Sequence, residues 1–161
     1  MLKIVYASIL LLFSFSLIGN AQISDTYCPD IIIKDIQILN QKGKKVTIVL
    51  TIENIGNMKA TVEGKTPAIQ DNLGWRAYLS TDLEFNGGDI LTGGDYFKGL
   101  KALPPGETMT MKSTIKMLKI TSFTNNLIID IDAGEVVQEC DEINNNKGIT
   151  LFGGSKKEEE N

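Results

Sequence analysis

Apolar side chains recur at every second position in several short stretches of this chain. In Val46–Glu53, valine, isoleucine and leucine alternate chiefly with threonine and glutamate, and in Glu107–Met117 methionine and isoleucine alternate with threonine and lysine. A period of two with many β-branched residues is typical of a strand with one buried and one solvated face. Because of this alternation, we interpret the methionines of the second stretch as soft core filler rather than as metal ligands.

Other stretches show the same preference more weakly. Gly74–Ser80 alternates with Trp75 on its apolar side, and we expect this large indole to anchor the core. Ile31–Leu39 and Leu127–Asp132 are further predicted strands, and shorter extended pieces lie at Ala60–Val62, Asp89–Leu91, Val136-Val137 and Lys147–Phe152. About seven short strands, with no helical period beyond the N-terminal apolar run, predict an all-β fold. The expected architecture is an antiparallel sandwich of the immunoglobulin or fibronectin type III kind.

Glycine, proline and asparagine mark the predicted turns. They lie at Gln41–Lys44, at Leu103–Gly106 and at the glycine pairs of Thr81–Gly94. At Asn54–Asn57 we expect Asn54 and Gly56 to supply a left-handed backbone. Met58–Leu73 lacks strong periodicity, so we interpret it as a long loop inserted before the Trp75 strand.

The first residues have the composition of an export signal. Lys3 supplies a positive charge, Ile9–Ile18 is apolar, and Gly19–Ala21 offers small residues for cleavage. The apolar run is shorter than the roughly 20 residues needed to span a bilayer, which favours a cleaved signal over a membrane anchor. We expect a mature chain without a membrane span, located in the periplasm, at the cell surface or in the medium.

The chain therefore divides into four parts. Residues 1–21 form the signal peptide and residues 22–28 a polar approach. Residues 29–152 form the sandwich, in one copy, because no internal repeat is visible. Residues 153–161 contain little apolar material to bury, so we expect a disordered tail.

The charge balance argues against nucleic acid as a partner. The 20 acidic residues outnumber the 16 basic ones, giving a formal net charge of −4, and the leader takes away Lys3 but no acid. Such a chain lacks the positive field that attracts DNA, RNA or an anionic membrane. The short basic run Lys42–Lys45 fits a solvated turn.

The two cysteines lie near the two ends of the predicted sandwich in the sequence. Cys28 precedes the first predicted strand and Cys140 the last. Disulfides persist in exported proteins, so we expect the two residues to pair, with two buried free thiols as the alternative. A bridge closing a loop of on the order of 100 residues is worth up to ~4–5 kcal/mol in the chain-entropy model.

The sequence contains few of the residues and motifs that enzymes use for catalysis. The chain has no histidine, the commonest general base and metal ligand, and it has neither a nucleophile elbow nor a phosphate-binding loop. Asp130 and Asp132 share a face of one predicted strand, but a carboxylate pair needs a cleft that a small sandwich does not offer. We expect no enzymatic activity.

One loop has the residue types of a cation site. Asp82, Glu84, Asn86 and Asp89 surround two glycines, and hard cations such as Ca²⁺ take oxygen ligands from flexible loops. The spacing differs from that of an EF-hand, and acidic hairpin loops are usually only solvated. Calcium is the one cofactor that we consider, and only as an alternative.

Several short motifs follow one another in a characteristic order. They are Pro29–Ile33, Val46–Asn57, Tyr78–Asp82, Leu103–Glu107, Ile129–Asp132, Val136–Glu139 and Glu142 with Asn144-Asn145. Their order and spacing together resemble the CARDB family, the cell-adhesion-related domain found in bacteria, over about residues 29–152.

This resemblance implies an extracellular, non-catalytic, immunoglobulin-like sandwich. Cys28 and Cys140 depart from the family pattern, and this fits a disulfide between the ends of the sandwich. Glu142 and Asn145 are expected to hydrogen-bond backbone groups at the corner before the last strand.

The expected function is binding, with protein interaction or adhesion as the first interpretation. A protein partner would bind at an exposed sheet edge or on the 58–73 insertion, for example at residues 63–70. The alternatives are a calcium-binding or a carbohydrate-binding module of the cell envelope. Carbohydrate binding requires exposed aromatic rings, and the candidates are Tyr78, Phe85, Tyr96 and Phe97.

Overall fold

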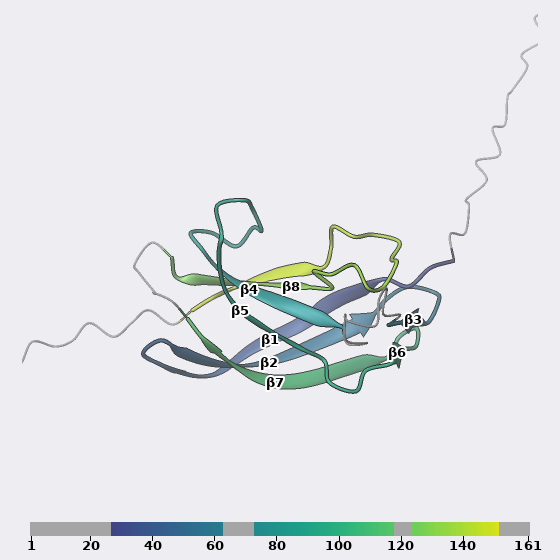
Figure 1. Cartoon of the computed structure of the whole chain (residues 1–161), viewed down its shortest axis with the longest axis horizontal. Coiled ribbons are helices and arrows are strands. Elements are labelled where there is room, and N and C mark those ends of the chain that lie inside the picture. The colour runs from purple at the N-terminus through teal and green to yellow at the C-terminus, as the bar shows by residue number, and fades with distance from the viewer. Residues whose placement is uncertain (1–26, 63–72, 118–123, 152–161) are drawn as a thin grey trace, which may run out of the picture.

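The alternating stretches form the strands of an antiparallel β-sandwich (Figure 1). The computed structural model describes residues 27–62, 73–117 and 124–151. The predicted signal peptide, residues 22–26 of the polar approach and the predicted tail lie outside the described residues, and so do residues 63–72 of the insertion. The described part of the chain holds no helix with the length and apolarity needed to cross a bilayer.

The first layer is a three-stranded sheet, here called sheet A. It consists of β1 (Ile31–Lys42), β2 (Lys45–Asn54) and β7 (Thr108–Lys116), in the order β1-β2-β7. A short turn at Gly43-Lys44, with Gly43 at φ 57°, joins β1 to β2. Both pairings are antiparallel, and the short turn between β1 and β2 requires this for the first pair.

The second layer is a four-stranded sheet, here called sheet C. Its order is β5 (Ile90–Tyr96), β4 (Gly74–Ser80), β8 (Asn126–Ile131) and β9 (Asn146–Thr150). Two short strands, β3 (Ala60–Thr61) and β6 (Ala102–Leu103), pair at one end. Among the described residues seven strands thus build the two layers, which confirms the predicted fold class.

The core lies between the inward faces of the two sheets. Every second residue of β2 is buried, and Trp75 of β4 is almost fully enclosed, as its apolar surroundings predicted. The indole Nε1–H of Trp75 donates to Met111 Sδ at 3.1 Å, and Met109 packs against the same core. Each large buried side chain contributes roughly 1.5–3 kcal/mol, so this layer holds the sandwich together. The assignment of the methionines to the core is confirmed.

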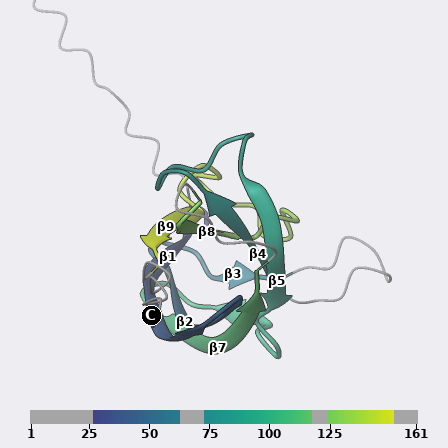
Figure 2. The ribbon, with the colours of Figure 1, turned by 90° about the vertical axis from the view of Figure 1, so that its left-hand side faces the viewer.

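The two sheets also meet along both of their edges (Figure 2). At one seam Lys147 of β9 donates through Nζ to the carbonyl oxygen of Lys34 on β1, at 2.9 Å. At the other, Ser113 of β7 donates to Asp95 of β5 at 3.4 Å, and a Cβ on Gly93 would lie 3.0 Å from Ile115. Each edge therefore contacts the opposite sheet at these positions, which limits strand addition there.

Several local predictions were wrong. Gly93-Gly94 is not a turn but the middle of β5, because strand pairing holds both glycines opposite β4. β1 runs beyond Leu39 to Lys42, with irregular register between Ile38 and Asn40. Val136-Val137 forms no strand, since its amides are bound by a carboxylate described below. The Leu103–Gly106 turn is confirmed, with Gly106 at φ 75°.

Candidate binding surface

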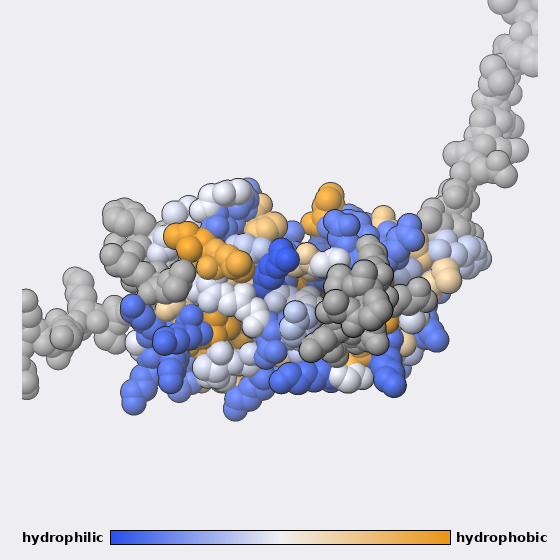
Figure 3. Space-filling model, viewed as in Figure 1, coloured by the Kyte–Doolittle hydropathy of each residue, from blue (hydrophilic) through white to orange (hydrophobic). Residues whose placement is uncertain are grey.

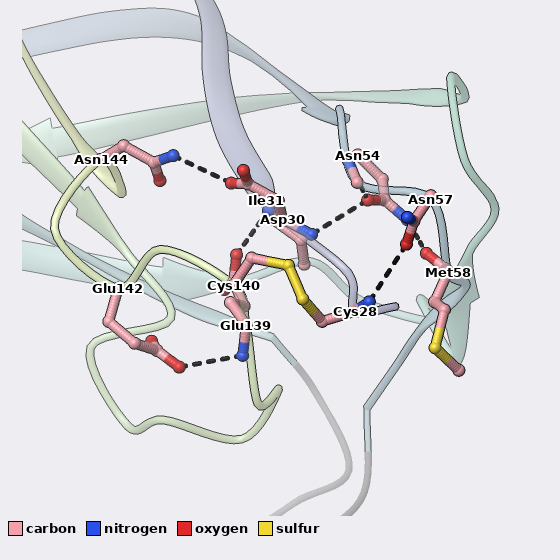
Figure 4. Close-up of a disulfide and its surroundings, with 11 residues drawn as sticks. Cys28, Asp30, Ile31, Asn54, Asn57, Met58, Glu139, Cys140, Glu142 and Asn144 are labelled. Carbon is pink, nitrogen blue, oxygen red and sulfur yellow. Dashed lines mark hydrogen bonds between the residues drawn. A yellow bond between two sulfur atoms is a disulfide. The ribbon is translucent and has the colours of Figure 1, made fainter. Parts of the chain in front are cut away.

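One end of the sandwich is joined by a disulfide. Cys28 pairs with Cys140, with a Cα–Cα separation of 5.5 Å, as the two cysteines predicted (Figure 4). Beside the bridge, the Cys140 amide donates to the carbonyl oxygen of Pro29 at 2.9 Å. The start of the domain is thereby fixed to the loop that precedes β9. We call this region, residues 28–31, 54–58 and 139–145, the disulfide corner.

Asn54 is the polar centre of the disulfide corner. Its fully buried side chain accepts from the amides of Asp30 and Gly56 at 3.1 and 3.0 Å. It donates through Nδ2 to the carbonyl oxygens of Met58 and Leu103 at 2.7 and 2.8 Å. Its conformation is not left-handed, contrary to the sequence prediction, because the side chain itself satisfies the turn.

Gly56 also has no positive φ, so that prediction was wrong as well. A Cβ at this position would lie 2.5 Å from the carbonyl oxygen of Cys28. Glycine is therefore needed for the close approach of the two backbones rather than for a special dihedral angle.

Glu139 connects the same corner to β1. Its buried carboxylate accepts from the amide of Ile31 and, at 3.2 Å, from Asn145 Nδ2. Burial raises the pKa of Glu139 to about 8, and the neighbouring Asp132 and Glu142 carboxylates add to this rise. The Glu142 carboxylate accepts from the Glu139 amide at 2.9 Å, which confirms the predicted backbone contact. Asn145 contacts a side chain instead.

The two carboxylates considered as a catalytic pair have separate roles. Asp132 lies beyond the end of β8 at φ 50°, and its two oxygens accept from the amides of Val136 and Val137, each at 2.9 Å. Asp130 remains on the outward face of β8. Its pKa is raised above the ordinary value, because the effect of burial outweighs the opposing effect of the Arg76 charge. The Asp132 carboxylate thus orders the following loop.

The predicted calcium candidates lie on the exposed connection between β4 and β5. The Asp82 carboxylate accepts from the Glu84 amide at 2.9 Å, and that of Asp89 accepts from the Asn86 amide at 2.8 Å. Asn86 Oδ1 accepts from Gly88 at 2.9 Å. Within residues 27–62, 73–117 and 124–151 no three acidic, histidine or cysteine side chains are grouped closely enough to hold a metal ion.

The four aromatic candidates do not form a row. Phe97 is fully buried in the core, so its prediction as an exposed ring was wrong. Phe85 packs on Tyr78, with ring centroids 4.9 Å apart and a tilt of 53°. Tyr96 lies at the far end of β5 beside Gly74, its cross-strand partner. The structure therefore separates Tyr96 from the Tyr78–Phe85 pair.

Around that pair lies an apolar surface that the sequence did not identify. We call it the outer apolar patch, and it consists of Leu83, Phe85 and Leu91, each about half exposed. Leu91 is opposite Tyr78, which pairs in turn with Ile128 on β8, so these positions form a row across sheet C. Figure 3 shows apolar surface in the region of this connection.

The connection between β4 and β5 folds back over sheet C. A Cβ on Gly148 would lie 2.7 Å from the carbonyl oxygen of Leu83 and 2.9 Å from the Ile128 side chain. Ile128 faces outward in the alternation of β8, but it is fully buried because this connection lies over it. A glycine in β9 is the sequence signal that could have suggested this close packing.

The outward face of sheet A is different in kind. Threonine hydroxyls bridge its strands, Thr47 to Thr114 and Thr51 to Thr110, each pair 3.0 Å apart. Such cross-strand threonine pairs stabilise a solvated face. The outer apolar patch therefore belongs to sheet C, and the broad face of sheet A opposite it is polar.

Two solved structures of one domain are similar to this chain. The CARDB domain of the PF1109 protein from Pyrococcus furiosus, determined in complex with di-metal ions, matches with 15% identity and a TM-score of 0.48. The match covers 78% of this chain and 90% of that domain. The chain resembles a CARDB domain. The solution structure of the same domain gives 16% identity and a TM-score of 0.47, covering 77% of this chain and 95% of that one.

Part of a larger enzyme is also similar. Beta-glucosidase 3B from Thermotoga neapolitana, in complex with glucose, matches with 11% identity and a TM-score of 0.42. This match covers 76% of the chain but only 16% of the glucosidase. No protein-family model matches the sequence, and no curated protein sequence matches it either.

Proposed function

We propose that this chain is an extracellular, non-catalytic binding module that holds a protein partner against the outer apolar patch. The observation that carries the proposal is the concentration of exposed apolar side chains on one connection of sheet C. Single exposed apolar residues are ordinary, but a contiguous group marks an interaction surface.

The patch favours a folded partner that presents its own apolar side chains. Strand addition is restricted at the contacts between the sheet edges, where Gly93 and Asp95 of β5 approach β7 and Lys147 binds a carbonyl group of β1. The side chains of Phe85 and Leu91, held in place by Tyr78, offer a fixed apolar surface instead. Desolvating such a surface is the main driving force of protein association.

Two features support a binding role outside the cell. The Cys28–Cys140 disulfide is of a kind that persists in oxidising compartments, in agreement with the export signal predicted from the sequence. The carboxylates of Asp132 and Glu142 accept backbone hydrogen bonds, and histidine is absent from the sequence, which supports a role without catalysis.

The proposal is tested by capture of a partner from a cell-envelope extract by the purified mature protein. Leu91→Lys places a charge in the middle of the patch and should reduce capture at least tenfold, because the charge must be desolvated on binding. Leu39→Lys is the matched control, since Leu39 is 51% exposed and Leu91 54% exposed, on different sheets.

Capture that survives in Leu39→Lys and is lost in Leu91→Lys supports the proposal. Equal capture by both variants and the unchanged protein would contradict it. A photo-crosslinking residue at position 85 should then join the partner directly to the patch, whereas the same residue at position 114 on sheet A should not.

A further inference from the structure

A recess lies on the outward face of sheet C, away from the outer apolar patch. It has a volume of about 370 Å³ and is formed where β4 begins, β5 ends and the turn after β8 crosses over. Ligand sites for small molecules usually measure about 300–1,000 Å³, so this recess is large enough for one small ring-shaped ligand.

Two of the glycines that line it lie in closely packed strands. A Cβ on Gly94 would lie 2.5 Å from the carbonyl oxygen of Trp75, so no other residue fits there. A Cβ on Gly74 would lie 3.3 Å from the Tyr96 ring, which covers this position. Bare backbone beneath an aromatic ring lets a ligand come close to main-chain polar groups.

The walls carry hydrogen-bond donors that no described residue accepts. Tyr96 is 48% exposed, and its hydroxyl has no partner among the described residues. Arg76 is exposed, and no hydrogen bond or ion pair within the described ranges engages its guanidinium group, which has five N–H donors. These two side chains project from neighbouring strands around one recess.

The acidic residues of the recess are already engaged. The Asp95 carboxylate accepts from the Tyr96 amide at 2.9 Å and from the Ser113 hydroxyl at 3.4 Å. The Asp132 carboxylate accepts from two loop amides, as described above. The recess therefore offers donors and one aromatic face.

Charge excludes a fully anionic ligand. Among the described residues, Arg76 is the only cationic side chain lining the recess, and it lies opposite Asp130 in the strand register. An anion would also be close to Asp132, which lines the same recess. An aromatic ring favours a ligand with one apolar face, and the hydrogen-bond donors favour a ligand rich in hydroxyl groups. Because the recess has no net positive charge, we expect this ligand to be neutral.

We infer that this recess binds a single neutral pyranose ring of a glycan. The apolar face of the sugar would lie on Tyr96, and its hydroxyl groups would accept from Arg76 and from the Tyr96 hydroxyl. The site is independent of the outer apolar patch and of the protein partner proposed for it.

The test is a two-dimensional ¹⁵N–¹H NMR titration of the mature protein. The probes are D-glucose, D-galactose and N-acetyl-D-glucosamine, with D-glucuronate as the anionic comparison. We expect saturable shifts of the Gly74, Gly94 and Gly134 amides with at least one neutral sugar. Absence of saturable shifts at these amides with all three neutral sugars would overturn the inference, as would binding of glucuronate alone.

Variants separate a specific site from a general effect on folding. Tyr96→Ala should weaken sugar binding at least tenfold, whereas Tyr96→Phe should keep most of it because the ring remains. Arg76→Gln should weaken binding severalfold. Phe85→Ala, an aromatic truncation in the outer apolar patch, should leave sugar binding unchanged. Equal binding by Tyr96→Ala and the unchanged protein would contradict the assignment.

The two proposals fail independently. Tyr96→Ala should still capture the protein partner, and Leu91→Lys should still bind the sugar. Loss of both activities in either variant would mean that the recess and the patch are not separate sites, and this would overturn the inference.

Discussion

The disulfide corner and the connection between β4 and β5 differ in which side chains they bury and which they expose. In the corner, polar groups are buried and bound: Asn54 makes four hydrogen bonds, and Glu139 binds the start of β1. In the connection, the Asp82 and Asp89 side chains accept from amides two or three residues away in the sequence. Leu83 and Phe85, together with Leu91 of β5, are exposed to solvent.

The difference separates residues that maintain the fold from residues available for binding. A buried polar group without its partner costs about 1–3 kcal/mol, so changes in the corner should affect stability. An exposed apolar side chain contributes little to folding, so changes in the connection should affect recognition. The following predictions test this division, from the largest expected effect to the smallest.

Removal of the disulfide should have the largest effect. The bridge closes a loop with a sequence separation of 112 residues, so Cys28→Ser with Cys140→Ser should lower the free energy of unfolding by ~4–5 kcal/mol. Urea unfolding of the double variant and of the oxidised protein measures the difference. Equal midpoints, or two free thiols in the secreted protein by mass spectrometry, would contradict the bridge.

Asn54→Ala should destabilise the domain by about 3 kcal/mol. The change leaves two amides and two carbonyl oxygens in the corner without their partner, and the site is fully buried. Asn57→Ala is the control, because Asn57 accepts from the Cys28 amide at an exposed position. We expect the control to lose less than about 1 kcal/mol, and a similar loss in both variants would refute the central role of Asn54.

Stability should fall as the pH rises from about 5 to about 9. Because the pKa of Glu139 is about 8 in the folded chain and its ordinary value is 4.5, the folded state holds the proton more tightly. The stabilisation is complete below the lower value and is lost as the pH passes the higher one, by up to a few kcal/mol.

Glu139→Gln should flatten this pH dependence, whereas Glu135→Gln, at an exposed position, should not. Thermal melts across the pH range provide the measurement. If the Glu139→Gln variant and the unchanged protein show the same slope and direction, another group must titrate.

Leu91→Lys should change the free energy of unfolding by no more than about 0.5 kcal/mol, because the side chain is exposed. By contrast, Leu79→Ala on the adjacent strand β4 should lose about 2–5 kcal/mol, since Leu79 is buried in the core. Urea unfolding of both variants measures the difference. A large loss in the first variant would mean that the outer apolar patch maintains the fold.

Calcium should have the smallest effect. The oxygens of Asp82 and Asp89 already accept backbone amides, so about 5 mM Ca²⁺ should raise Tm by no more than about 1 °C. The calcium interpretation stays a prediction until this melt is measured. A rise of several degrees that Asp89→Asn abolishes would establish it.

Local patterning accounts for most of the fold. Gly74–Ser80 is a strand with the boundaries that its alternation predicted, and Trp75 is buried as expected. These features depend on the period of two, which is contained in the strand itself. The pairing of Cys28 with Cys140 also followed from cysteine usage and position, without knowledge of the geometry.

The surface could not be predicted in the same way. The burial of Ile128 depends on a connection that folds back over β9, and the burial of Phe97 depends on how β5 ends. Gly94 looks like a turn residue in sequence but is required by the close approach of β4. Each of these facts is a long-range contact, so no local window contains it.

The disulfide also determines how the domain would respond to a pulling force applied at its two ends. Tension entering at Cys28 would pass through the bridge to Cys140 and bypass the strands between them. Only the segment after Cys140, which includes β9, could then extend, by about 3.3–3.6 Å for each residue released. Extension would thus be limited to that segment, while sheet A and strands β4, β5 and β8 of sheet C stay folded.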